Sequence, residues 1–271
     1  QDQKINYNFA EQVHRKHLRL TSELIQEAKP DLILWSEASA LFSIPIGGEW
    51  TKEITDLART HHMPLVVGSD SYTAKQVFNT AYFINANGEI ESEYSKMYLV
   101  PFGEFVPLSS LFFFAGKVVP EISDFSPGAR HTLFRMNGNS FAIHICFEVV
   151  FPQLTRTFCR KGATLLATIT NDAWFGDTAA PHQHFAMVVM RAIESRRYMV
   201  RAANTGISGI VDPYGRILHQ SSLFVPAKIA GDVQWIHEQT FYTLWGDVLV
   251  YLSIIVSVLA IARAMMKVRE P

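Results

Sequence analysis

The sequence has 271 residues, 48% of them hydrophobic and 18% charged. This globular composition excludes a disordered chain, a collagen-like chain and a coiled coil. The 24 Lys and Arg residues and 25 Asp and Glu residues leave a net charge of −1. A nucleic-acid-binding protein needs a basic face for the phosphate backbone, so this balance excludes that class.

Apolar periodicity and turn residues predict helices that alternate with strands. Helices are expected over residues 8–29, 51–62, 152–161 and 182–201. Strands are expected over residues 32–35, 65–67, 80–84, 90–94, 132–136, 140–145, 165–170, 207–211 and 216–219. Turns rich in Asn, Gly, Asp and Pro predict three hairpins, which join 80–84 to 90–94, 132–136 to 140–145 and 207–211 to 216–219. The fold class is therefore α/β with a mixed sheet.

The C-terminal region predicts a membrane helix. Residues 241–262 form a run of 22 residues with a single charge, Asp247, and about 20 apolar residues span a bilayer. Aromatic residues on its leading side, such as Trp245, suit the membrane interface. A buried core helix is the alternative, but the run is followed at once by a basic tail. We expect a domain over 1–240, a transmembrane helix over 241–263 and a tail over 264–271.

The charges around this helix predict its orientation. No Lys or Arg occurs from 229 to 262, whereas Arg263, Lys267 and Arg269 follow. Positively charged flanks remain in the cytoplasm, so the tail is expected inside and the large domain outside. Because no segment of this sequence would export that domain, we expect an upstream membrane portion and regard the chain as a C-terminal fragment.

Three reactive residues follow the ends of predicted strands, where α/β sheets place their chemistry. These are Glu37, Lys96 and Cys146. Alone, each has an ordinary explanation, as a cap or surface charge, a solvated lysine or a small core residue. Together they suit acyl transfer through a thioester. The cysteine is the nucleophile, the glutamate accepts its proton and the lysine stabilises the oxyanion. Cys159 instead has the helical context of a buried thiol.

Several segments resemble the apolipoprotein N-acyltransferase family of the nitrilase superfamily. They are YSKMYLVPFGEFVP at 94–107, ICFE at 145–148, NDAWFG at 171–176 with QHF at 183–185, NTGIS at 204–208 and DPYG at 212–215. The resemblance implies a nitrilase-like α-β-β-α sandwich on the outer, periplasmic face of the bacterial inner membrane. It also implies that the first strand of the domain, which normally precedes a position like Gln1, is missing.

The resemblance implies an enzyme that transfers a fatty acyl chain from a phospholipid to Cys146. The α-amine of a diacylglyceryl-modified cysteine at an apolipoprotein N-terminus then accepts the chain, and no cofactor or metal is required. Two positions depart from the family pattern. Ser36 replaces the proline that usually precedes the first triad residue, and Phe147 replaces a tyrosine that often follows the cysteine.

The family's site residues carry over onto matching positions. The resemblance implies Glu37 as the general base. Lys96 and the backbone N–H of Phe147 would form the oxyanion hole. Glu104 would position the lysine and the amine, and Glu148 would support the site.

Other segments have competing interpretations. The apolar segment 108–119 predicts a lipid-contacting arm at Leu111, Phe112, Phe113 and Phe114, with a core helix as the alternative. His182 and His184 are interpreted as the start of a helix in preference to a metal site. Asn171 and Asp172 could fix a loop or contact substrate. The competing functions are a membrane-tethered nitrilase-type amidase acting on a small amide and a scaffold with an inactive site.

Overall fold

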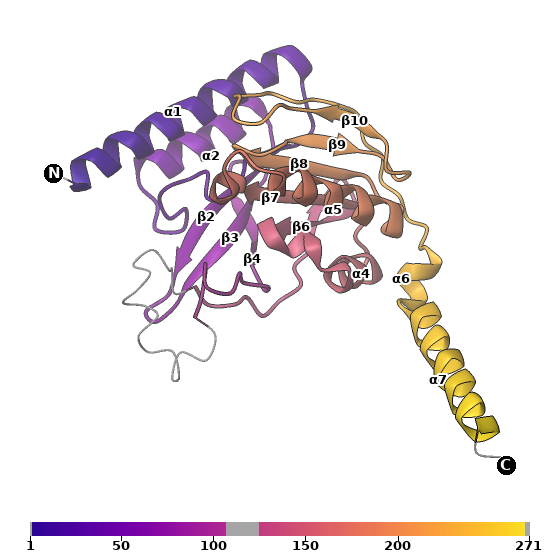
Figure 1. The fold of residues 1–271 in the computed structure, drawn as a ribbon. Coiled ribbons are helices and arrows are strands. Elements are labelled where there is room, and N and C mark those ends of the chain that lie inside the picture. Colours follow the sequence, from indigo (N-terminus) through magenta and orange to yellow (C-terminus); the bar gives the residue numbers. More distant parts are fainter. Residues whose placement is uncertain (1, 107–124, 269–271) are drawn as a thin grey trace.

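The computed structural model describes residues 2–106 and 125–268, where two β-sheets stack between two layers of helices (Figure 1). Helices α1 and α2 cover one outer face, and α4 and α5 cover the other (Figure 1). The helices are α1 Asp2–Ala28, α2 Glu49–His61, α4 Pro152–Arg160, α5 Ala180–Ser195, α6 Phe241–Trp245 and α7 Val248–Val268, with short 3-10 helices η1 Cys146–Val150 and η2 Asp172–Phe175. The arm expected at Leu111–Phe114 lies outside the described residues.

Both sheets are mixed, as the hairpin pattern predicted. The first has the order β1-β2-β3-β4, with β1 parallel to β2 and the other pairs antiparallel. Its strands are β1 Ile33–Leu34, β2 Leu65–Tyr72, β3 Val77–Ile84 and β4 Ile90–Ser95. The second has the order β10-β9-β8-β7-β6-β5, and β6, β7 and β8 are parallel. Its strands are β5 Phe134–Met136, β6 Asn139–Ile145, β7 Leu165–Asn171, β8 Met199–Asn204, β9 Gly209–Val211 and β10 Ile217–Gln220.

Alternate residues of the first sheet contribute to two cores, because successive side chains of a strand point to opposite faces. On β2, Leu65 and Val67 belong to a core that includes side chains of α1 and α2, whereas Val66 belongs to the core shared with the second sheet. On β3, Tyr82 belongs to the core beneath α1 and α2, and Phe83 belongs to the core shared with the second sheet. Burial on both faces fixes the register of these strands, since a slip by one residue would exchange the two sets.

The three predicted hairpins are confirmed, since β3–β4, β5–β6 and β9–β10 pair antiparallel. The helix predicted over 182–201 is wrong in its last part. Helix α5 ends at Ser195, Arg196 takes a left-handed φ of 50°, and β8 follows and pairs with β7. The buried guanidinium of Arg197 ties this turn down by donating to the carbonyls of Ala163 and Glu238 at 3.0 and 2.6 Å.

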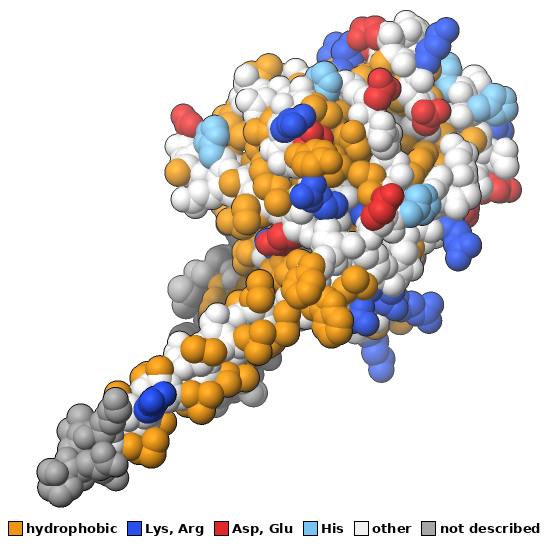
Figure 2. Space-filling view, turned by 90° about the vertical axis from the view of Figure 1, so that its right-hand side faces the viewer, with side chains coloured by type: hydrophobic (Ala, Val, Ile, Leu, Met, Phe, Trp, Pro, Cys, Tyr) orange, Lys and Arg blue, Asp and Glu red, His pale blue; other side chains and the backbone are white. Residues whose placement is uncertain are grey.

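Helix α7 projects from the folded domain (Figure 1), and apolar side chains line the face of it that Figure 2 shows. Its segment Val248–Met266 has 19 residues and a mean hydropathy of 2.3, and none of it is buried against the domain. By length and composition, this segment could cross a membrane. The span predicted as one helix over 241–263 is divided, because Gly246 takes a φ of 64° between α6 and α7. Arg156 of α4 fixes α6 by donating to the carbonyls of Thr243 and Leu244 at 2.9 and 2.8 Å.

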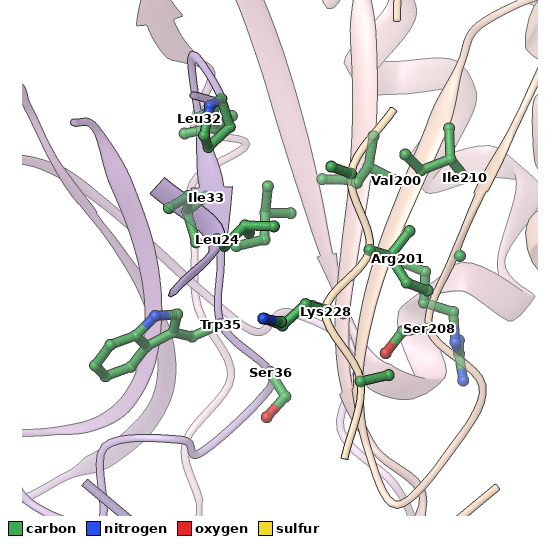
Figure 3. A pocket seen from close by; sticks show the side chains of 18 of the residues that line it. Leu24, Leu32, Ile33, Trp35, Ser36, Val200, Arg201, Ser208, Ile210 and Lys228 are labelled. Atoms are coloured by element: carbon green, nitrogen blue, oxygen red, sulfur yellow. The ribbon is translucent and has the colours of Figure 1, made fainter. Parts of the chain in front are cut away.

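A cavity of about 820 Å³ lies at one edge of the sandwich. Figure 3 shows Leu24 and Ile33 on one side of it, Val200 and Ile210 on the other, and Lys228 between them. The lysine forms ion pairs with Glu23 and Glu27 of α1, which ties the C-terminal segment to that helix.

Candidate active site

Two predicted site residues meet where strands β1 and β4 end. Glu37 follows β1 and Lys96 directly follows β4, and both side chains are buried. The Nζ atom of Lys96 lies 3.4 Å from Oε1 of Glu37. Cys146 directly follows β6, and the charges of both residues influence its thiol. The structure therefore brings residues from three strand ends, far apart in sequence, into one site.

Glu104 is the nearer carboxylate to the lysine. Lys96 Nζ donates to Oε1 of Glu104 at 2.8 Å, while Oε2 of Glu104 accepts from the backbone N–H of Val100 at 2.9 Å. Glu104 therefore holds the ammonium group and also closes the turn that follows Lys96.

Glu37 is held by donors that sequence reasoning missed. Its Oε1 accepts from Nδ2 of Asn79 at 2.7 Å, and its Oε2 accepts from the backbone N–H of Asn171 at 2.6 Å. The turn at Glu37 also packs directly on β2, where a Cβ at Gly68 would lie 2.6 Å from the carbonyl oxygen of Ser36. Gly68 therefore permits the approach that places Glu37.

Cys146 combines a strained backbone with a thiol that is only partly exposed. Its φ of 54° is left-handed, a region that costs a residue with a Cβ about 1–2 kcal/mol. Burial raises the pKa of its thiol to about 12, an effect that the charge of Glu37 increases and that Lys96 and a hydrogen bond from Thr170 oppose. The resting nucleophile is therefore a neutral thiol, which needs a base to accept its proton.

Lys96 remains a cation although it is buried. Burial disfavours the ammonium form, but the charges of Glu37 and Glu104, together with that of Cys146 once it is a thiolate, outweigh that effect and raise the pKa of Lys96 above its ordinary value. A fixed positive charge in a site closed to water can stabilise an oxyanion far better than an exposed one.

Glu148 joins the nucleophile segment to the lysine segment. Its Oε1 accepts from the hydroxyl of Tyr94 at 2.8 Å and from the backbone N–H groups of Met97 and Tyr98 at 2.7 and 3.2 Å. Its Oε2 accepts from the backbone N–H of Ile145 at 2.8 Å. Four donors face this buried carboxylate, so it fixes both strand ends through their backbones.

The remaining predicted residues have different surroundings. The ring of Phe147 packs edge-on against Phe151, with centroids 5.3 Å apart. His184 lies in α5, which begins at Ala180, and its ring contacts Asp172 and the carbonyl of Cys146. Within the described residues, no group of three or more His, Cys, Asp or Glu side chains is placed to hold a metal ion.

Comparisons with known proteins identify the family of this chain. The family model for carbon–nitrogen hydrolases matches residues 3–234. An apolipoprotein N-acyltransferase of Geobacter metallireducens is 37% identical over 259 residues, which cover 93% of this chain and 50% of that protein. One of Methylococcus capsulatus is 37% identical over 221 residues, covering 80% of this chain and 43% of that protein. The predicted resemblance is confirmed, and the chain spans about half the length of these curated relatives.

Solved structures confirm the nitrilase-like fold. Nit3 of Saccharomyces cerevisiae, a member of branch 10 of the nitrilase superfamily, has a TM-score of 0.61 at 18% identity, covering 79% of this chain and 81% of that chain. An amidase of the nitrilase superfamily from Nesterenkonia AN1 has a TM-score of 0.59 at 18% identity, covering 80% of this chain and 82% of that chain. At this identity the likeness concerns the fold alone.

We predict that Glu148→Gln destabilises the protein although it preserves size. The amide oxygen can replace only one carboxylate oxygen, and the NH2 group then faces a backbone donor. A buried donor left unsatisfied costs about 1–3 kcal/mol, which unfolding in detergent would measure. Tyr94→Phe, which removes one of four donors, should cost less. Wild-type stability in Glu148→Gln would contradict the assigned role.

Proposed function

This chain belongs to the carbon–nitrogen hydrolase family, and we propose that it carries the catalytic domain of an apolipoprotein N-acyltransferase. The reaction would move a fatty acyl chain from a membrane phospholipid to the N-terminal amine of a diacylglyceryl apolipoprotein. The observation that carries the proposal is the buried lysine held by two carboxylates beside the half-buried Cys146. The names of the relatives supply the transferred group, an acyl chain, and the class of acceptor, an apolipoprotein.

The first half-reaction acylates the cysteine. Glu37 accepts the thiol proton while the sulfur of Cys146 bonds to the ester carbonyl carbon. Lys96 and the backbone N–H of Phe147 stabilise the oxyanion. The location of Phe147 at the beginning of η1 supports this role, since the first N–H groups of a helix have no partner within it. The C–O bond then breaks, and Glu37 returns the proton to the departing lysophospholipid.

The second half-reaction releases the acyl chain to the amine. The α-amine attacks the thioester carbonyl, a C–N bond forms and the C–S bond breaks. Glu37 accepts a proton from the attacking amine and delivers it to the departing sulfur, which restores the thiol. Glu104 accepts a hydrogen bond from Lys96, so it would hold the lysine in place and help to orient the amine.

The amidase alternative uses the same residues but transfers the acyl group to water. The apolar helix α7 and the relatives named as acyltransferases support the lipid substrate over a small amide. An intact set of Glu37, Lys96 and Cys146 argues against an inactive scaffold.

We predict that Cys146→Ala abolishes both the acyl adduct and the transfer product. Intact-mass spectrometry of the membrane-extracted protein should detect a fatty-acyl adduct on the wild type only. Cys146→Ser should turn over poorly, because an alkoxide leaves less readily than a thiolate. The control is Cys159→Ala, which removes a buried thiol of α4 outside the site and should leave the adduct unchanged. Normal transfer by Cys146→Ala would disprove the mechanism.

We predict that Glu37→Gln slows adduct formation by about 10²–10⁴-fold, the usual contribution of a general base. Lys96→Ala should be at least as damaging, and Lys96→Arg should not restore the rate, since the planar guanidinium does not replace a compact ammonium. Glu49→Gln and Lys52→Ala change exposed residues of α2 and serve as matched controls. A near-normal rate of adduct formation in Glu37→Gln or in Lys96→Ala would refute the assigned roles.

We further propose that α7 spans the inner membrane with the domain in the periplasm. The basic residues Arg263, Lys267 and Arg269 support a cytoplasmic C-terminus. A reporter enzyme fused after Pro271 should therefore show cytoplasmic activity, and protease added from the periplasmic side should cleave loops of the domain. A reporter active only in the periplasm would reverse the orientation and exclude the proposed role.

A further inference from the structure

A second polar cluster reaches Cys146, formed by residues that the proposed reaction does not use. Thr170 is the penultimate residue of β7, Asp172 begins η2, His184 lies in α5 and Arg201 lies in β8. All four side chains are buried, with exposed fractions of 0, 1, 6 and 2%. Buried polar groups are costly unless they are hydrogen-bonded, so their contacts indicate what they hold in place.

Asp172 is linked to the nucleophile by two routes. Oγ1 of Thr170 donates to Oδ1 of Asp172 at 2.9 Å. The same hydroxyl lowers the pKa of the Cys146 thiol, because it can donate to the sulfur when the thiolate forms. The ring of His184 bridges Asp172 Oδ1 at 2.9 Å and the carbonyl oxygen of Cys146 at 3.2 Å. One route ends at the sulfur and the other at the backbone of the same residue.

Arg201 fixes Asp172 as an anion. Its Nη2 donates to Oδ2 of Asp172 at 2.6 Å, and its Nε donates to the carbonyl of Ile207 at 2.9 Å. Burial alone would raise the pKa of Asp172, but hydrogen bonds from His184 and Thr170 and the charge of Arg201 outweigh it and lower that pKa. The carboxylate is therefore a stationary acceptor behind the nucleophile.

We propose that Thr170, Asp172 and His184 are positioning residues that control the reactivity of Cys146. The hydroxyl of Thr170 has one proton and two possible acceptors. It donates to Asp172 while the sulfur is protonated and to the sulfur once that proton has left. Asp172 tolerates the exchange because Oδ1 also contacts His184. His184 holds the carbonyl of Cys146 and so maintains the left-handed backbone that aims the sulfur.

The inference rests on the proposed function only in treating Cys146 as the nucleophile. Its test needs neither lipid nor apolipoprotein, because it follows alkylation of the thiol by iodoacetamide in the membrane-embedded protein with Cys159→Ala as background. Failure of acyl transfer would leave this measurement intact, so the two proposals can fail separately.

Thr170→Val removes the hydroxyl and keeps the shape. We expect Cys146 to be alkylated about tenfold more slowly between pH 7 and 10, equivalent to a thiol pKa about one unit higher. Thr170→Ser should restore the rate. The matched control is Thr168→Val on the same strand, whose buried hydroxyl has no partner among the described residues. An unchanged rate in Thr170→Val, or an equal decrease in Thr168→Val, would overturn the proposal.

His184 provides an independent comparison. The amide of His184→Gln can still donate to the carbonyl of Cys146, whereas His184→Leu cannot. We expect alkylation within about threefold of wild type for Gln and about tenfold slower for Leu, roughly the effect of one hydrogen bond. A variant that unfolds would instead expose the thiol and react faster. Equal rates in the two variants, or faster alkylation in both, would refute the role of His184.

Discussion

The buried ammonium of Lys96 is the interaction on which the rest of the site depends. A charge taken out of water is tolerated only when partners compensate it, and here Glu37 and Glu104 approach within 3.4 and 2.8 Å. Each carboxylate then needs donors of its own. Asn79 and the backbone of Asn171 supply them to Glu37, and Val100 supplies one to Glu104.

Such an arrangement is poor evidence for stability, because buried ion pairs often contribute less than apolar residues of the same volume. The stability comes from the two cores on either side of the first sheet, which also fix the strand ends. The site uses that rigidity. Both the left-handed backbone of Cys146 and the approach of Glu37 over Gly68 are strained or tight features that surrounding structure must hold.

The sequence was informative where chemistry follows a local pattern. Glu37, Lys96 and Cys146 could be predicted because each follows the end of a predicted strand. Asn79 could not, since it donates to a residue 42 positions away and nothing in a strand sequence marks such a contact. His184 could be singled out because it belongs to the QHF motif at 183–185. Its contact with the carbonyl of Cys146 could not be predicted, because the two residues are 38 positions apart. The predicted helix extended into Met199–Arg201, the first half of β8, because Arg196 makes the left-handed turn that ends α5, where a glycine would usually mark such an end.

A chain of contacting elements also connects the nucleophile to the apolar helix α7. Cys146 opens η1, η1 leads into α4, and Arg156 of α4 donates to the last carbonyls of α6, which a helix end leaves without partners. Only Gly246 and Asp247 separate α6 from α7. Under the proposed membrane placement, a short run of rigid elements therefore sets the position of the thiol relative to the bilayer. An enzyme that takes an acyl chain from a lipid needs that constraint, because its substrate is confined to the membrane surface, whereas an amidase acting on a dissolved substrate does not.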